Sequence, residues 1–344
     1  MVRRSFNLLT PMRHFWFPVL LTILLAACTT PAVSPLPLFP SSPSPLPNTP
    51  TPIPLISPTL PPPTAPTQTP FISPSPTLLF SPTPLPHAAP TPHHTPTPDT
   101  PPHPRQWRTW PIVPTLSPNM IPVFLDGQAQ GKNPTAFSTL GDCQSEPPVF
   151  LGIYASDRYY LGTGYEYLQT TIDFFAQSGS FGRQSYCTQN GLSVASALSP
   201  TWANKDDCLK DETPLACEIR LYQPSLMFIN LGTNWSANAT ASHEAYLRQI
   251  VEILLSEGII PILSTKGDNN EGDWSIDQSI AQVAYDYDLP LWNFWAAIQD
   301  LPGHGLDPAR PGNNYLITDA WDRRSFTGLQ VLDSIRKTLE PYYP

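Results

Sequence analysis

The sequence predicts a three-layer α/β/α domain, in which a parallel sheet of about five strands lies between two layers of helices. From residue 136 to the end, short apolar runs alternate with segments whose apolar residues recur at helical spacing. The run at 259–265, IIPILST, is almost continuously apolar, as expected for a strand that is covered on both faces. Because strands that alternate with helices are joined by crossover connections, we expect the strands to be parallel.

The first half of the domain contains two predicted strands and two predicted helices. The run AFSTLGD (136–142) is a short apolar strand that ends in a Gly-Asp turn. The segment 165–179 has apolar residues at helical spacing and stops at a glycine. The segment FGRQSYC (181–187) is strand-like, and LSVASAL (192–198) is typical of a short helix.

The second half continues the alternation more regularly. Its clearest helix is amphipathic, covers 243–258 and is closed by Gly258. The other predicted helices are 215–223, 275–288 and 325–339, and the predicted strands are 224–234, 259–265 and 289–295. Ligand sites in such sheets form at the carboxyl ends of the strands. The turns at 141–143 and 232–234 both fall there.

The N-terminus is typical of a lipoprotein precursor. Arg3, Arg4 and Arg13 precede a short apolar run, which ends in LAAC (Leu25–Cys28). LAAC resembles the bacterial lipobox, so we expect residues 1–27 to be a signal peptide and Cys28 to be acylated. The expected partner is then membrane lipid, on the extracytoplasmic face of the cell membrane. The alternative is an uncleaved anchor helix with an incidental cysteine.

Residues 28–104 are predicted to be a disordered stalk. From Thr29 to Pro104 the chain holds 28 of its 47 prolines and no glycine, a composition that favours extended, solvated backbone and no core. A semi-rigid stalk and a spacer with no specific partner both fit. Residues 105–344 are long enough for one folded domain.

Charge and composition exclude several classes of function. All 27 acidic residues and 15 of the 18 basic residues lie from Asp99 onward, a formal charge of −12 for that part. Such a balance argues against nucleic acid as a partner, because phosphates would be repelled. No glycine-rich phosphate loop and no Cys/His spacing suited to zinc occurs, so we expect no cofactor and no metal.

Four cysteines remain when Cys28 is assigned to lipid. An even number in an exported protein suggests disulfides. Cys208 and Cys217 bracket a short polar loop and form the natural pair. That leaves Cys143 with Cys187, unless both stay as thiols.

Three short motifs, in this order, resemble those of the SGNH (GDSL-type) hydrolases. Gly141-Asp142-Cys143 looks like that family's Gly-Asp-Ser block, and Gly232-Thr233-Asn234 looks like its Gly-x-Asn block. Between them, QNGLSVAS is similar to the block whose glycine, here Gly191, helps to bind the oxyanion. The resemblance covers about 137–339 and implies a flavodoxin-like SGNH fold and hydrolysis of esters, such as acyl groups on glycans. It also implies a site that contains Asp142, Cys143, Gly191 and Asn234.

The chain departs from that pattern at the nucleophile and at the base. Cys143 stands where the family has serine, and a thiolate needs a nearby cation or base. The family's Asp-x-x-His block aligns best with NNYLIT, where Asn313 and Leu316 replace the two functional residues; a later register offers Arg323. The remaining candidate base is His304, which Asp307 would orient.

Several other residues have two interpretations each. We expect His243 to have a surface or capping role, and the loop KGDNNEGD (266–273) to be solvated unless it binds a sugar or a cation. The aromatic residues of LPLWNFW are expected in the core rather than in sugar stacking. Ser145 is an alternative hydroxyl nucleophile. Two functions therefore stay open: an extracytoplasmic ester hydrolase with impaired catalysis, and a non-catalytic binding or envelope-organising lipoprotein.

Overall fold

The computed structural model describes residues 102–235, 238–310 and 312–344. The predicted signal peptide, Cys28 and residues 28–101 of the predicted stalk lie outside the described residues. Within them, no helix is both long enough and apolar enough to cross a bilayer.

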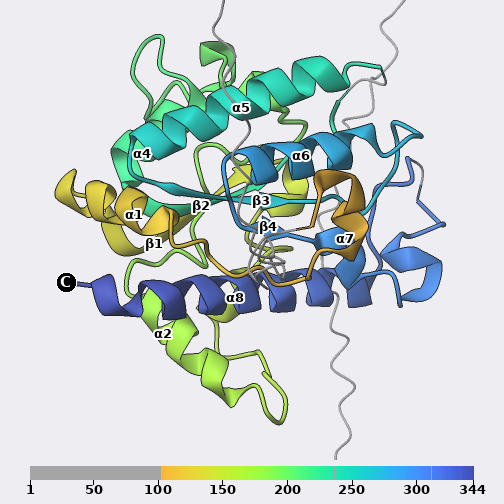
Figure 1. The fold of residues 1–344 in the computed structure, drawn as a ribbon, viewed down its shortest axis with the longest axis horizontal. Helices are drawn as coiled ribbons and strands as arrows, with labels where there is room; N and C mark the ends of the chain where they lie inside the picture. Colours follow the sequence, from red (N-terminus) through yellow and green to blue (C-terminus); the bar gives the residue numbers. More distant parts are fainter. Residues whose placement is uncertain (1–101, 236–237, 311) are drawn as a thin grey trace, which may run out of the picture. The chain divides into compact units, whose positions relative to one another are not determined.

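The centre of the fold is a parallel sheet in the order β1-β2-β3-β4 (Figure 1). The strands are β1 (Asn133–Gly141), β2 (Pro224–Asn230), β3 (Ile260–Ser264) and β4 (Leu291–Trp292). Every residue of β2 and β3 is buried, as predicted for strands covered on both faces. The α/β class and the parallel arrangement are therefore confirmed.

The sheet has four strands among the described residues, whereas about five were predicted. The segment 181–187 is not a strand, and only Thr188 forms a single parallel bridge, to Gly141. Side chains satisfy the backbone here: Phe137 N–H donates to Ser180 Oγ (3.0 Å), and Tyr186 N–H donates to a carboxylate oxygen of Glu218 (2.9 Å). Because these donors already have partners, a continuous ladder along the outer edge of β1 does not form.

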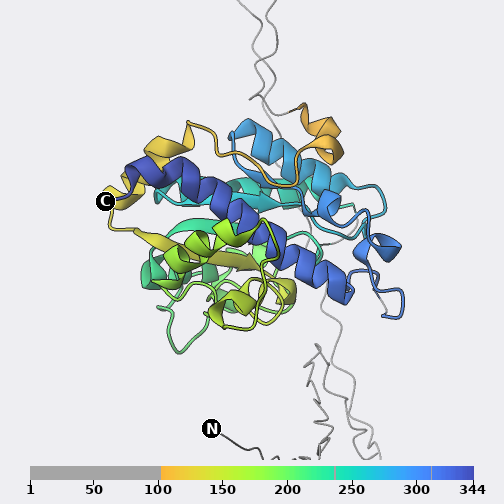
Figure 2. The same cartoon turned by 90° about the horizontal axis from the view of Figure 1, so that it is seen from below.

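Helices cover both faces of the sheet. α5 and α6 lie on one side, and α8 lies with α2 on the other, where α8 runs across the sheet (Figures 1 and 2). The helices are α1 (Met120–Ala129), α2 (Gln169–Ala176), α3 (Val194–Ala197), α4 (Pro214–Tyr222), α5 (Thr240–Ser256), α6 (Ser275–Asp286), α7 (Phe294–Ala297) and α8 (Thr318–Leu339). The three-layer arrangement is the predicted one.

Three helices differ from the sequence prediction, and one of them, α7, begins at Phe294 within the predicted strand 289–295, of which only Leu291–Trp292 is a strand. α1 was not predicted, because Pro122 and Gly127 lower the helix propensity of its residues. α8 begins at Thr318 rather than at Ser325, since its first two turns are rich in charged residues that hide the apolar face. This earlier start places Arg324 inside the helix.

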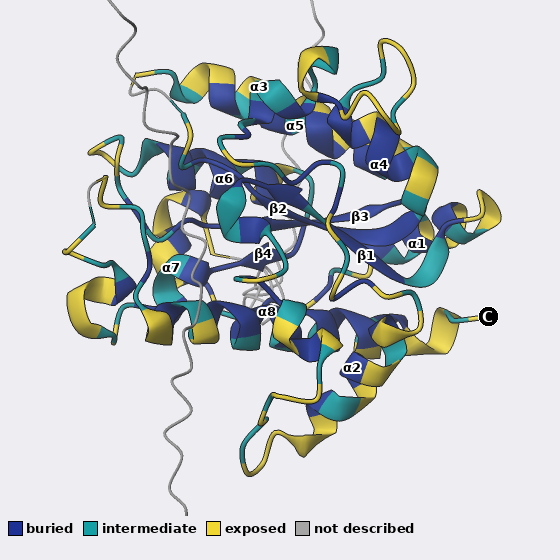
Figure 3. Cartoon of the chain, turned by 180° about the vertical axis from the view of Figure 1, so that it is seen from behind, coloured by how far each residue is buried: buried dark blue, intermediate teal, exposed yellow. Residues whose placement is uncertain are grey.

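The core is built around aromatic side chains of the central strands. Phe228 of β2 meets Phe137, Phe150 and Trp292 edge-on, and Phe150 stacks on Trp292. Trp292 and Phe294 are fully buried, so their predicted role in the core is confirmed, whereas Trp295 is only partly buried against that core. The buried strands lie between the helices in Figure 3. The sheet edge is thereby held on rigid, densely packed elements.

Candidate functional site

The Gly-Asp-Cys and Gly-Thr-Asn motifs meet at the carboxyl edge of the sheet. Asp142 follows β1 directly, and Asn234 follows the turn after β2. Asn234 Nδ2 donates to Asp142 Oδ2 over 2.8 Å. The structure thus brings together two of the residues that the resemblance placed in one site.

Asp142 organises the turn that carries Cys143. Its Oδ1 accepts from Gln144 N–H (2.9 Å) and caps a short 3-10 turn, Cys143–Ser145. Burial raises the pKa of Asp142 to about 6, against the opposing effects of that N–H and of the Arg324 charge. Both oxygens of this carboxylate accept hydrogen bonds within the fold, which makes it a structural anchor for the turn.

Arg324 is a buried cation that sequence reasoning missed. It projects from α8, is 3% exposed, and lies over the rings of Phe294, Phe150 and Trp292 at 4.7–5.2 Å. Burial lowers the pKa of Arg324 to about 10, while the charge of Asp142 opposes this. One sequence signal was available: Arg324 lies four residues after Ala320 and four before Gly328, both on the buried face of α8.

A small cavity lies between Arg324 and the strand ends. Its volume is about 10 Å³, room for a single water, and its lining includes Asp142, Asn230, Thr233 and Lys266. Neither polar atom of the Asn230 amide has a hydrogen-bond partner, and neither does Arg324 Nε. Unpaired polar atoms around a cavity of this size fit a bound water rather than a substrate.

The loop after β3 was expected to be solvated, but only Asn270, Gly272 and Asp273 are exposed. Lys266 is 7% exposed and Asp268 is 2% exposed. Lys266 Nζ donates to Asp268 Oδ1 (2.8 Å) and to Glu271 Oε2 (2.6 Å), and Thr233 Oγ1 donates to Asp268 Oδ2 (2.8 Å). Burial alone would lower the pKa of Lys266, but the neighbouring carboxylates outweigh it and raise the pKa. The loop is an internal ionic network that connects the ends of β2 and β3.

Two further buried groups adjoin this network. Asp277 of α6 is fully buried and accepts from Lys266 N–H (2.9 Å); burial raises the pKa of Asp277 to about 8. His243 is 1% exposed, within hydrogen-bond distance of Ser279 Oγ (3.2 Å) and edge-on to Trp235. Burial lowers the pKa of His243 to about 4, so the expected surface or capping role is wrong: it is a neutral core histidine.

The cysteines pair only in part as expected. Cys208 and Cys217 form a disulfide. No disulfide joins Cys143 to Cys187, so of the two alternatives that the sequence left open, the structure has the one without this bond. Cys187 is fully buried, and its Sγ lies 3.2 Å from Ser185 Oγ and 3.4 Å from the Thr139 carbonyl oxygen. Burial raises the pKa of the Cys187 thiol, which makes it unreactive.

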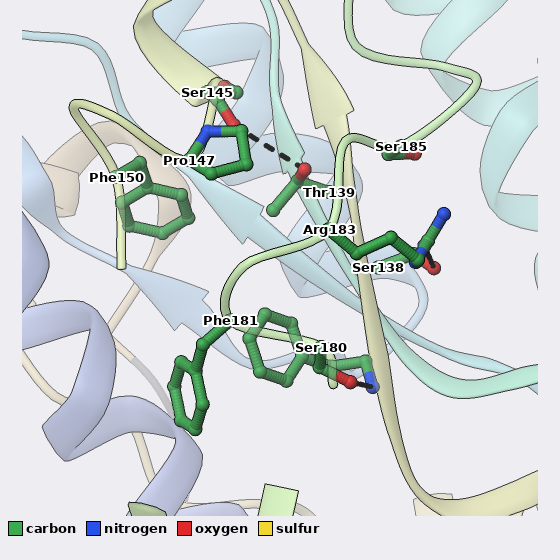
Figure 4. Close-up of a pocket in the computed structure, with 10 residues that line it drawn as sticks. Ser138, Thr139, Ser145, Pro147, Phe150, Ser180, Phe181, Arg183 and Ser185 are labelled. Atoms are coloured by element: carbon green, nitrogen blue, oxygen red, sulfur yellow. Dashed lines mark hydrogen bonds between the residues drawn. The ribbon is translucent and has the colours of Figure 1, made fainter. Parts of the chain in front are cut away.

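Ser145 lies inside the protein and cannot act as a nucleophile. It is 1% exposed and faces a second small cavity beside β1 (Figure 4). The Thr139 hydroxyl donates to the Ser145 carbonyl oxygen over 3.4 Å. A Cβ on Gly141 would come within 2.1 Å of Ser145 Oγ, so the turn requires glycine at 141. The glycine of the Gly-Asp-Cys block therefore serves close packing.

Leu316 stands at the position that the resemblance aligns with the family's histidine. Leu316 is 5% exposed and lies within 3.5 Å of the position that a Cβ on Gly267 would take. Gln144 Nε2 donates to the Asn314 carbonyl oxygen (2.9 Å), which ties this segment to the Cys143 turn. Position 316 is therefore filled by a buried alkyl side chain, which cannot transfer a proton. Arg323 instead donates to the Ala297 carbonyl oxygen.

His304 is exposed and is engaged elsewhere. Its Nδ1 lies 3.0 Å from the Gln299 carbonyl oxygen, and its backbone has a left-handed φ of 52°. Asp307 Oδ1 accepts from Ala309 N–H in its own turn (2.9 Å). Within the described structure no hydrogen bond joins Asp307 to His304. The predicted orienting pair is therefore not formed, while a direct role of His304 stays a prediction.

A wide groove opens beside Gly191, which adopts a left-handed φ of 78°. The groove has a volume of about 830 Å³. It is lined by Glu146, Gln184, Ser185, Tyr186, Thr188, Gln189, Asn190, Thr201, Trp202, Ala203 and Asn204. Asn190 precedes the predicted oxyanion-binding glycine, and Glu146 follows Cys143 by three residues. The groove thus adjoins both the Cys143 turn and the Gly191 turn.

No protein-family model matches the chain, and no curated protein matches its sequence. A GDSL-like lipase from Bacteroides thetaiotaomicron is 14% identical, covers 62% of this chain and 97% of its own, and has a TM-score of 0.38. A lipase/acylhydrolase from Enterococcus faecalis is 14% identical with 60% and 96% coverage and a TM-score of 0.36. An SGNH-hydrolase family esterase is 15% identical, with 62% and 98% coverage and a TM-score of 0.30. These are likenesses to solved structures at low identity and with TM-scores below 0.5; the three layers of the domain follow from its own sheet order and from the helices on the two faces of the sheet.

Proposed function

We propose that this chain is a membrane-anchored lipoprotein whose SGNH-like domain binds its ligand without efficient ester hydrolysis. The observation that best supports this proposal is Leu316, a buried alkyl side chain at the position where the resemblance places the catalytic histidine. The family's nucleophilic serine is also replaced, by Cys143. The first residues support the anchoring part, because the LAAC sequence at Leu25–Cys28 resembles a lipobox.

The chemistry of acyl transfer explains why the loss of a base matters. A thiol or hydroxyl attacks an ester only when a neighbouring group takes its proton. General-base assistance contributes roughly 10²–10⁴-fold in rate. Asp142 has the pKa of a possible base, about 6, but both of its oxygens already accept from Gln144 and Asn234.

The rest of the site supports binding. Asn234 and Asp142 are held together at the sheet edge, and the groove beside Gly191 is open. Such a pre-formed concave site on a rigid sheet suits a ligand without the need for turnover. Ester hydrolysis at Cys143 is the competing function, and it predicts a measurable rate that depends on the thiol.

The test compares the native protein with a variant that restores the missing groups. We expect native hydrolysis of p-nitrophenyl acetate to stay near the buffer rate and to be unchanged in Cys143→Ala. In the triple variant Cys143→Ser, Asn313→Asp, Leu316→His, we expect the rate to rise by about 10²-fold or more. The matched control is Cys143→Ser alone, which has a hydroxyl but no base.

Two outcomes decide the question. Efficient native turnover that disappears in Cys143→Ala would contradict the proposal and establish a cysteine hydrolase. Because Leu316→His places a polar ring in a buried position, circular dichroism and a thermal melt establish that the triple variant folds. The native and Cys143→Ala rates remain decisive even if the triple variant does not fold.

A further inference from the structure

We propose that the groove beside Gly191 binds a neutral oligosaccharide, with the Trp202 ring as the platform on which one sugar stacks. This inference names the ligand class for the proposed binding function and rests on it. Three separate stretches of chain build the groove: Glu146, the segment 184–190, and the segment 201–204. Its volume of about 830 Å³ is within the usual range for small-ligand sites and fits a few sugar units.

Trp202 is an exposed aromatic ring on the wall of a groove whose other lining residues are polar, apart from Ala203 and the ring of Tyr186. It ends a short 3-10 turn, Pro200–Trp202, and is 37% exposed. Its Cη2 atom lies 3.9 Å from the position that a Cβ on Gly191 would take. Gln189 Nε2 donates to the Trp202 carbonyl oxygen (2.8 Å), which fixes the turn to the rest of the groove. A large ring that is held in place and left partly uncovered suits stacking against the apolar face of a sugar.

The polar lining matches the hydroxyl groups of a sugar. Gln184 Nε2 donates to the Thr188 carbonyl oxygen (2.8 Å), so its amide is oriented while its oxygen remains available. Gln189 is fixed in the same way, by its bond to Trp202. Asn190 is exposed at the groove and makes no side-chain hydrogen bond within the described structure. Amides donate and accept hydrogen bonds, as sugar hydroxyls do.

The charge of the lining separates neutral from anionic ligands. The groove contains no Lys or Arg, and its one ionisable acid is Glu146. An anionic ligand group beside the Glu146 carboxylate would be repelled, because like charges oppose each other. Phosphate, sulfate and uronic acid groups have no cationic partner here, which favours a neutral glycan. A sugar stacked on Trp202 lies beside Gly191, so the groove and the strand-end site would form one continuous binding surface.

The test measures binding of defined oligosaccharides to the full chain in detergent. Isothermal titration calorimetry is run with neutral hexasaccharides of glucose, xylose, mannose and N-acetylglucosamine, and with hexagalacturonate as the anionic comparison. We expect at least one neutral hexasaccharide to bind, and hexagalacturonate to bind at least tenfold more weakly. We expect Trp202→Ala to weaken the binding roughly tenfold or more.

The matched control is Tyr160→Ala, which removes another exposed aromatic ring, 87% exposed and outside the groove lining. It should bind as the native protein does. The inference is overturned if no neutral hexasaccharide binds, if the anionic one binds more tightly, or if Trp202→Ala binds like the native chain. Thiol-dependent ester turnover is a separate readout: it contradicts the absence of efficient hydrolysis but leaves the sugar measurement interpretable.

Discussion

Two segments at the same edge of the fold differ sharply. The loop after β3 (266–274) buries its Lys266 and Asp268 charges in a hydrogen-bonded network, whereas the segment before α8 (302–317) exposes His304 and turns through several glycines. The first segment connects strand ends; the second is where the resemblance expects the catalytic base. Among the described residues, the first segment thus holds its charges by buried contacts, whereas the second presents its histidine to solvent.

The difference has a physical basis. A buried charge network is costly to disturb, because removal of one member leaves the others uncompensated in a medium of low polarity. An exposed turn loses little when one side chain is exchanged for another. Stability therefore holds the buried residues of the loop after β3 in place, while it places little constraint on the exposed side chain of His304.

The largest predicted effect concerns Lys266. Replacement by Met should leave the buried carboxylates of Asp268 and Glu271 without their cation and lower the free energy of unfolding by about 3–5 kcal/mol. Urea denaturation followed by circular dichroism measures this. The matched control is Arg323→Met, which removes a largely exposed ion pair with Asp300 and should cost less than about 1 kcal/mol. If the two variants lost similar amounts of unfolding free energy, the predicted difference between a buried and an exposed ion pair would be wrong.

The next effect is a dependence of stability on pH near neutrality. Because burial raises the pKa of Asp277 from 3.8 to about 8, the folded state keeps a proton that the unfolded state releases near pH 4. Stability from this group is fully present below about pH 4 and is lost as the pH rises through 8. We expect the free energy of unfolding to fall by about 2 kcal/mol between pH 6 and pH 8.

Asp277→Asn should remove that slope, since the amide oxygen can still accept from Lys266 N–H and no proton is exchanged. Asp273→Asn, in the loop just before α6, is the matched control, because Asp273 is exposed and its pKa is lowered by hydrogen bonds from Ser275. Between pH 6 and pH 8, the free energy of unfolding of the Asp273→Asn variant should fall as much as that of the native protein. A native protein whose unfolding free energy is flat in this interval would show that Asp277 is ionised in the fold.

Sequence periodicity predicted most of the fold because burial on both faces imposes continuous apolar runs on the strands. The meeting of Asp142 with Asn234 also followed from their positions after adjacent strands. Sequence periodicity could not predict contacts between segments that are distant in the chain. The side chains of Ser180 and Glu218 accept the backbone hydrogen bonds that a fifth strand would have used. Arg324 reaches the strand ends from α8, although it lies more than ninety residues after the end of β2. The burial of the loop after β3 was missed because its composition is that of a solvated turn.

The smallest predicted effect is the most direct probe of the segment before α8. His304 has left-handed backbone angles, in which a side chain with a Cβ is strained, and its Nδ1 faces only the Gln299 carbonyl oxygen. His304→Gly relieves that strain while it removes the imidazole, so the free energy of unfolding should stay within about 0.5 kcal/mol of the native value or rise slightly. His304→Asn is the companion variant, because asparagine tolerates these angles and keeps a polar side chain. Neither variant should change the basal rate of p-nitrophenyl acetate hydrolysis. A fall in that rate in both variants, with the fold unchanged in thermal melts, would place an imidazole base in the site after all and make the two segments partners in catalysis.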